Sequence, residues 1–100
     1  MEQAVIVKFS YGLDSIKEIF DLEDLLESAI ESAGVGGFDG DEIAVDLSDG
    51  YLYMYGPDAN AVYAVVEPIL KSASFMKSAQ VTLVYGELGG DVPRKIVHLS

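Results

Sequence analysis

The chain of 100 residues contains no cysteine, no tryptophan, one histidine and only six Lys and Arg side chains. The absence of cysteine excludes disulfides, thiolate nucleophiles and cysteine-ligated metal sites. No window approaches the ~20 apolar residues that a membrane-spanning helix needs, and the N-terminus lacks the basic start and apolar run of a signal peptide. We therefore expect a cytoplasmic protein that does not associate with membranes.

Basic side chains are missing altogether from the middle of the chain. Residues 18–70 carry thirteen acidic side chains and no Lys or Arg, and the net charge of the whole chain is −11. Such a block repels phosphate-rich polymers and anionic lipid and attracts basic surfaces. The charge pattern thus argues against nucleic-acid binding and favours a protein partner with a basic surface.

Half of the residues are hydrophobic, which is enough for a single domain, 1–100, with its own core. Residues 4–11 alternate between apolar and other side chains, the pattern of a strand buried on one face. Ser15 and Glu18 fit a capping box at the start of a helix, and Asp21 offers a second possible start. The helix is predicted to end at Gly34. Its expected buried stripe consists of Ile19, Leu22, Leu26, Ala29 and Ala33.

A β-hairpin is predicted next, with Asp49-Gly50 as a two-residue turn. In that register Val45 pairs with Met54, and Leu47 pairs with Leu52. The apolar side chains of both strands then share one face, and the tyrosines at 51, 53 and 55 share the other.

A second helix is predicted after Gly56-Pro57-Asp58, with Pro57 in its first turn. Its expected buried stripe consists of Val62, Val66, Ile69 and Ala73. Pro68 lies inside this helix and should kink or shorten it. Two further strands are expected at 80–85 and 94–99. The order strand, helix, strand, strand, helix, strand predicts an α+β ferredoxin-like sandwich, with an antiparallel sheet, two helices on one face and an extra C-terminal edge strand.

Two surfaces are candidate interaction sites. The uncovered sheet face should present aromatic side chains, which commonly mark protein interfaces. We predict that its contact residues are Tyr51, Tyr53, Tyr55 and Ile6, joined by Lys8, Thr82 and Val84. Aromatic residues on such a face can also stack RNA bases, but the negative charge argues against that use. The predicted acidic face consists of Asp24, Glu27, Glu31 and Asp46.

Metal, nucleotide and catalytic sites receive little support. The acidic segment 39–49 lacks the spacing of a helix–loop–helix calcium site, although a metal or small-molecule site there stays an alternative. The glycines at 34–37 follow a helix, whereas phosphate-binding loops precede one. His98 lies two residues from the C-terminus with no serine or acid recognisably arranged around it. We therefore assign no catalytic, metal or cofactor-binding residue and expect no enzymatic activity.

Three short motifs carry a resemblance to a known group of proteins. Ala33-Gly34-Val35-Gly36, Asp39-Gly40-Asp41-Glu42-Ile43 and Tyr55-Gly56-Pro57-Asp58-Ala59 resemble those of a family of small acidic bacterial proteins without an assigned activity. The similarity covers roughly residues 20–86. It implies a bacterial source and an intact single domain, and it transfers no functional residue.

These observations predict a non-enzymatic protein-binding domain. It is expected either to associate with itself through the tyrosines or to dock on a basic protein partner, as an immunity protein or inhibitor does. The alternative is a regulatory domain that binds a metal or small molecule at the acidic segment 39–49.

Overall fold

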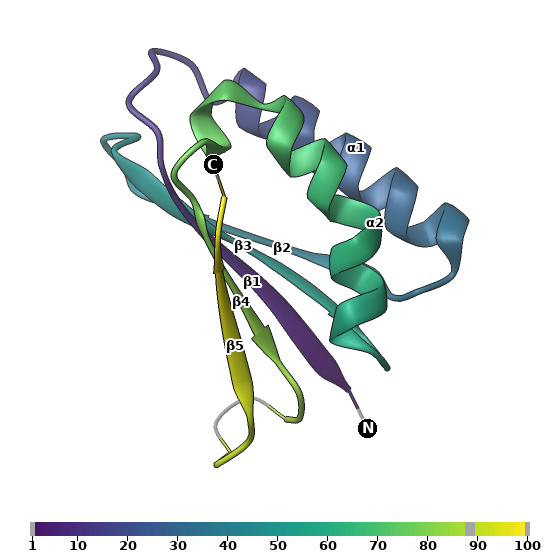
Figure 1. Cartoon of the computed structure of the whole chain (residues 1–100). Helices are drawn as coiled ribbons and strands as arrows, with labels where there is room; N and C mark the ends of the chain where they lie inside the picture. The colour runs from purple at the N-terminus through teal and green to yellow at the C-terminus, as the bar shows by residue number, and fades with distance from the viewer. Residues whose placement is uncertain (1, 88–89, 100) are drawn as a thin grey trace.

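The computed structural model describes residues 2–87 and 90–99, which form one five-stranded sheet and one layer of helices (Figure 1). Its elements, in chain order, are β1 (Gln3–Ser10), α1 (Lys17–Ala33), β2 (Gly37–Ile43), β3 (Asp49–Gly56), α2 (Ala59–Ser72), a 3₁₀ helix (Ser74–Met76), β4 (Gln80–Val84) and β5 (Arg94–His98).

The sheet has the strand order β2-β3-β1-β4-β5, and all neighbouring strands are antiparallel. Both helices cover the same face of the sheet, and β5 lies at the edge beside β4 (Figure 1). This is the predicted ferredoxin-like α+β fold with an added edge strand, which the structure confirms. None of the described helices lies on the opposite face of the sheet.

The core lies between the sheet and the helices. Val5, Val7 and Phe9 of β1 are buried there, as the alternation predicted. The helices contribute one apolar stripe each, and both stripes differ slightly from the prediction. In α1 the buried residues are Ile19, Leu22, Leu26 and Ile30, and in α2 they are Ala59, Val62, Val66 and Leu70.

The start of α1 corrects the predicted capping box. The Ser15 hydroxyl accepts a hydrogen bond from the Lys17 backbone N–H at 3.1 Å, but Ile16 occupies the N-cap position. Glu18 accepts a hydrogen bond from the Tyr11 hydroxyl at 3.0 Å instead of reaching back to the helix start. The other end agrees with the prediction, since Gly34 caps α1 in a left-handed conformation with φ of 67°.

Asp58 begins α2. Its carboxylate accepts a hydrogen bond from the Asn60 backbone N–H at 2.9 Å, and Pro57 precedes this cap, outside the first turn where the sequence placed it. The helix continues past Pro68 to Ser72, so Pro68 does not terminate it.

The predicted hairpin is wrong in its turn and its register. Asp49 and Gly50 belong to β3, the connection is the five-residue loop 44–48, and Val45 is fully exposed in that loop. β2 pairs with β3 through Ile43↔Gly50 and Phe38↔Met54, with one extra residue of β2 between Phe38 and Asp41.

The physical reason is the neighbouring strand. Asp49 and Gly50 pair with Ser10 and Phe9 of β1, so the long-range ladder outweighs their local preference for a turn. The loop is also anchored, because the Tyr11 and Gly12 backbone N–H groups donate hydrogen bonds to carbonyls of residues 48 and 47.

Candidate functional site

The sheet face turned away from the helices is the candidate site, and we call it the tyrosine face. Three cross-strand rows, defined by the pairing of the five strands, make it up. The first is Gly37, Tyr55, Ala4, Val84 and Arg94; the second is Tyr53, Ile6, Thr82 and Ile96; the third is Glu42, Tyr51, Lys8, Gln80 and His98. The predicted sheet-face residues therefore share one face of the sheet, although Val84 is fully buried there, like its neighbour Ala4.

Each tyrosine of β3 has a different environment. Tyr51 and Tyr53 stack with ring centroids 6.3 Å apart and planes 15° from parallel, and the Lys8 ammonium lies 6.0 Å from the Tyr51 ring centroid. The Tyr53 hydroxyl donates a hydrogen bond to Glu42, which together with burial raises the pKa of Tyr53 to about 12. The face is thus held in place by side-chain contacts of its own.

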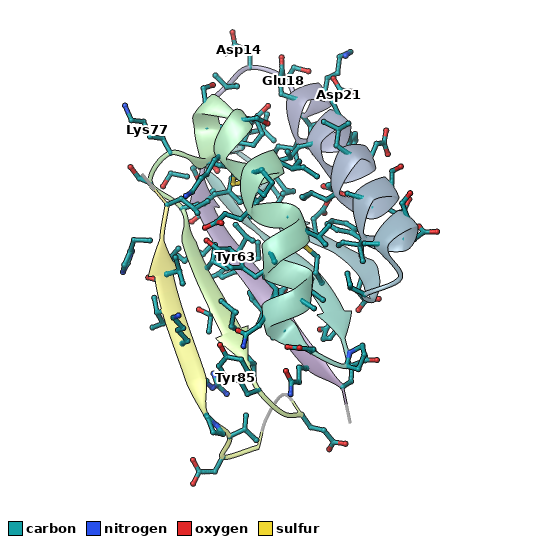
Figure 2. The ribbon with its side chains drawn as sticks, turned by 45° about the vertical axis from the view of Figure 1, so that its right-hand side comes forward. Asp14, Glu18, Asp21, Tyr63, Lys77 and Tyr85 are labelled. Carbon is teal, nitrogen blue, oxygen red and sulfur yellow. The ribbon has the colours of Figure 1, made fainter. Side chains whose placement is uncertain are left out.

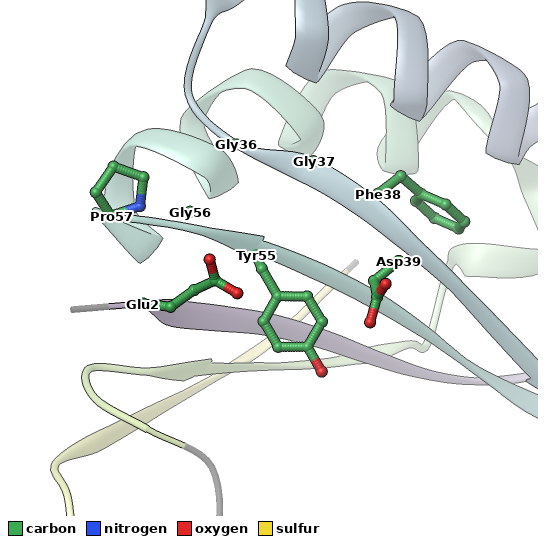
Figure 3. Close-up of a pocket in the computed structure, with 8 residues that line it drawn as sticks. All are labelled: Glu2, Gly36, Gly37, Phe38, Asp39, Tyr55, Gly56 and Pro57. Carbon is green, nitrogen blue, oxygen red and sulfur yellow. The ribbon is translucent and has the colours of Figure 1, made fainter.

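Tyr55 stands beside a hollow of about 350 Å³ at the β2 edge of the face. Figure 3 shows the carboxylates of Glu2 and Asp39 on either side of the Tyr55 ring. Burial, Asp39 and Glu2, in that order, raise the pKa of the Tyr55 hydroxyl. The lining is completed by Gly36, Gly37, Phe38, Gly56 and Pro57.

Two glycines let the backbone close this hollow. A Cβ atom on Gly36 would lie 1.9 Å from the Tyr55 carbonyl oxygen, and one on Gly56 would lie 2.1 Å from the Val35 carbonyl oxygen. Both contacts are impossible for a side chain, so glycine is required where the α1–β2 connection crosses the end of β3.

The acidic residues of α1 lie on the other side of the molecule. Asp24, Glu27 and Glu31 are exposed on the helix layer, and the carboxylates of Glu18 and Asp21 extend from the same layer (Figure 2). A single flat partner surface therefore cannot contact both the tyrosines and α1.

Asp46 does not join the acidic group of α1, although the sequence grouped it there. It lies in the loop 44–48, which is hydrogen-bonded to the connection between β1 and α1, while Glu31 lies at the far end of α1. The Asp46 carboxylate accepts a hydrogen bond from the Ser48 backbone N–H at 3.0 Å, and hydrogen bonding to Ser48 lowers its pKa.

Sequence reasoning missed a pair of acids between α1 and β2. Glu23 shares a hydrogen bond with Asp41, and burial, this bond and neighbouring carboxylates raise the pKa of Glu23 to about 8. The bulge in β2 directs Asp41 toward the helix layer, in register with the buried Leu52. No local signal in the sequence pairs two acids across eighteen positions.

The arrangement offers little for chemistry. Within residues 2–87 and 90–99, no group of three or more His, Asp and Glu side chains could hold a metal ion. His98 borders a second hollow with Ser10, Asp49 and Ser78, but none of the hydrogen bonds between described residues joins His98 to them. Neither described helix is long and apolar enough to cross a membrane.

Comparison with known proteins supports the fold. No protein-family model and no curated protein matches the chain. Among solved structures, Rv0793 from Mycobacterium tuberculosis is similar, with a TM-score of 0.52, 15% sequence identity and coverage of 100% of this chain and 94% of that chain. At this identity the likeness shows the fold alone, so the chain is a ferredoxin-like α+β domain.

Proposed function

We propose that this chain is a non-enzymatic protein-binding domain that associates with a second copy of itself through the tyrosine face. The observation that carries the proposal is an uncovered sheet face with three tyrosines, Ile6 and an Ile96 side chain that is 56% exposed. Stacking two such faces is a common way to bury an open sheet, with side chains interdigitating between the layers.

Charge also favours this face over the rest of the surface. Lys8 and Arg94 on the tyrosine face offset two of the three carboxylates there, which are Glu2, Asp39 and Glu42, whereas the chain as a whole carries −11. A second copy can therefore approach the tyrosine face with less repulsion than it meets at the helix layer.

The test is a pair of matched substitutions, each of which replaces an aromatic side chain with lysine. Tyr53→Lys places a charge in the centre of the tyrosine face, and Phe20→Lys does the same at a 49% exposed position on α1. Sedimentation velocity should show that Tyr53→Lys abolishes the dimer and Phe20→Lys retains it. Equal behaviour of the two variants, with circular dichroism unchanged, would contradict the proposal.

A second candidate function has an observation of its own. Phe20 lies in the same helical stripe as Asp24, Glu27 and Glu31, at spacings of four, three and four residues. An exposed aromatic ring among carboxylates suits a basic protein partner, as in immunity proteins or inhibitors. Because this stripe faces away from the sheet, such docking is compatible with the dimer.

A further inference from the structure

Arg94, the single arginine of the chain, lies across the sheet from the Tyr55 hollow. The hollow is lined by an aromatic ring and two carboxylates, and none of the described residues that line it has a basic side chain. Arg94 is exposed on β5, at the opposite edge. An arginine has the chemistry that the hollow lacks, but within one copy the strands β3, β1 and β4 lie between the β2 edge and β5.

The two sites nevertheless share a cross-strand row. The pairs Gly37↔Tyr55, Ala4↔Tyr55, Ala4↔Val84 and Val84↔Arg94 connect them directly. They therefore stand at the same height along the strands and differ only in their distance from the central strand β1.

The shared row determines which residues meet when two tyrosine faces stack symmetrically. A two-fold axis that runs parallel to the strands, in front of β1, brings β5 of one copy over β2 of the other and leaves each row at its own height. Arg94 of each copy then meets the other copy's Tyr55 hollow. In the same arrangement His98 meets Glu42, and Ile96 approaches Tyr53.

A dimer built on a two-fold axis that also lies parallel to the sheets, but perpendicular to the strands, has less favourable electrostatics. It places β2 over β2, so the carboxylates of Asp39 and Glu42 in one copy face those of its partner. It also places β5 over β5, so Arg94 faces the basic side chains on β5 of the partner copy. Like charges brought together in this way cost binding free energy.

We propose that the second copy supplies Arg94 to the hollow, where its guanidinium stacks on Tyr55 and pairs with Asp39 and Glu2. The inference rests on the proposed self-association and specifies its geometry. Planar guanidinium groups suit this environment because they stack on aromatic rings and donate paired hydrogen bonds to carboxylates. Each dimer contains two such contacts, so the hollow is complete only when the partner is present.

The area of the tyrosine face determines the protein concentrations at which the dimer should be measured. Five strands about 4.8 Å apart, each about 17–26 Å long, give an overlap on the order of 500 Å² per copy. The total, on the order of 1,000 Å², lies at the lower end of specific interfaces, so we expect a dissociation constant near the micromolar range.

The experiment measures the dimer dissociation constant by sedimentation equilibrium for Arg94→Glu, Lys95→Glu and Asp39→Arg. Lys95 is the matched control, because it neighbours Arg94 and pairs with the buried Leu83, on the helix side of the sheet. Arg94→Glu should weaken the dimer about tenfold or more, while Lys95→Glu, with the same change of net charge, should change it less than about twofold. Asp39→Arg should also weaken it, although this change lowers the net negative charge.

Mixing the two weakened variants identifies the contact. In a heterodimer of Arg94→Glu with Asp39→Arg, one end keeps the original Arg94–Asp39 pair and the other has it reversed. The mixture should therefore dimerise more strongly than either variant alone. The inference is overturned if Arg94→Glu behaves as Lys95→Glu does, or if the mixture gains nothing. If Tyr53→Lys still abolishes the dimer in that case, the proposed self-association through the tyrosine face stands and only the Arg94 contact is wrong. A wild-type protein that stays monomeric would overturn both the self-association and the Arg94 contact.

Discussion

The carboxyl of Glu23 on α1 and the carboxyl of Asp41 on β2 share a hydrogen bond, so two acids meet at the seam between helix and sheet. One Glu23 oxygen is buried without a hydrogen-bond partner. Burial and the neighbouring carboxylates favour the protonated form, which places the pKa of Glu23 near 8, well above its ordinary value of 4.5.

Stability should therefore fall as pH rises toward and through 8. The folded state binds more protons than the unfolded state between pH 4.5 and 8, so the contribution of Glu23 is complete below pH 4.5 and is lost as pH rises through 8. Glu23→Gln should raise the melting temperature at pH 8 and flatten its decline between pH 5.5 and 8.5. Thermal denaturation followed by circular dichroism measures both effects.

Glu27→Gln is the control for that experiment, since it makes the same substitution on the exposed side of α1. Glu27→Gln relieves general repulsion in this acidic chain at every pH tested, whereas Glu23→Gln does so only near and above pH 8, where Glu23 would be charged. Only Glu23→Gln should change the slope of stability with pH, and identical slopes for the two variants would contradict the pairing of Glu23 with Asp41.

Gly36 and Gly37 should differ sharply in their tolerance of alanine. A Cβ at position 36 collides with the Tyr55 carbonyl, where φ is 156°, while nothing lies within 4 Å of a Cβ at position 37. We expect Gly36→Ala to lower the free energy of unfolding by about 3 kcal/mol and Gly37→Ala by less than about 1 kcal/mol. Urea denaturation measures both free energies. A Gly36→Ala variant as stable as Gly37→Ala would contradict the close contact between the α1–β2 connection and the backbone of Tyr55.

Asp58 should contribute to the stability of α2 as its N-cap. Asp58→Ala removes the acceptor of the Asn60 N–H and should cost about 1 kcal/mol, whereas Asp58→Asn keeps an acceptor and should cost much less. The same urea titration applies, and equal losses in the two variants would mean that charge, not capping, stabilises this end.

Salt should distinguish the two proposed surfaces. Each copy carries −11, so screening reduces the repulsion between copies, and dimerisation through the tyrosine face should strengthen by several-fold between low and moderate salt. Docking of a basic protein on α1 should weaken over the same range. Analytical ultracentrifugation at several salt concentrations follows the first effect, and a dimer that dissociates as salt rises would show that ion pairs across the interface outweigh the repulsion between the copies.

The sequence was informative wherever one local pattern acted alone. The alternation of Tyr51, Leu52, Tyr53 and Met54 placed the tyrosines opposite the core correctly, because a period of two is enough to separate the faces. Gly34 likewise marked the end of α1.

Prediction failed where distant residues decide the structure. The turn preference of Asp49-Gly50 gave way to pairing with β1, and the irregular pattern of β2, interrupted by glycines, hid its pairing and its bulge. The Glu23–Asp41 pair and the row that connects Tyr55 with Arg94 depend on that register. Neither could be derived before the strands were placed.

The central claim is that the tyrosine face is covered by a second copy of the chain. The most direct test is the solution mass of the unmodified protein, measured by light scattering on a sizing column at moderate salt, over concentrations from about tenfold below to tenfold above micromolar. We predict a rise from the 10.8 kDa of one chain toward twice that mass as concentration increases. A mass that stays at one chain over the whole range would contradict the account.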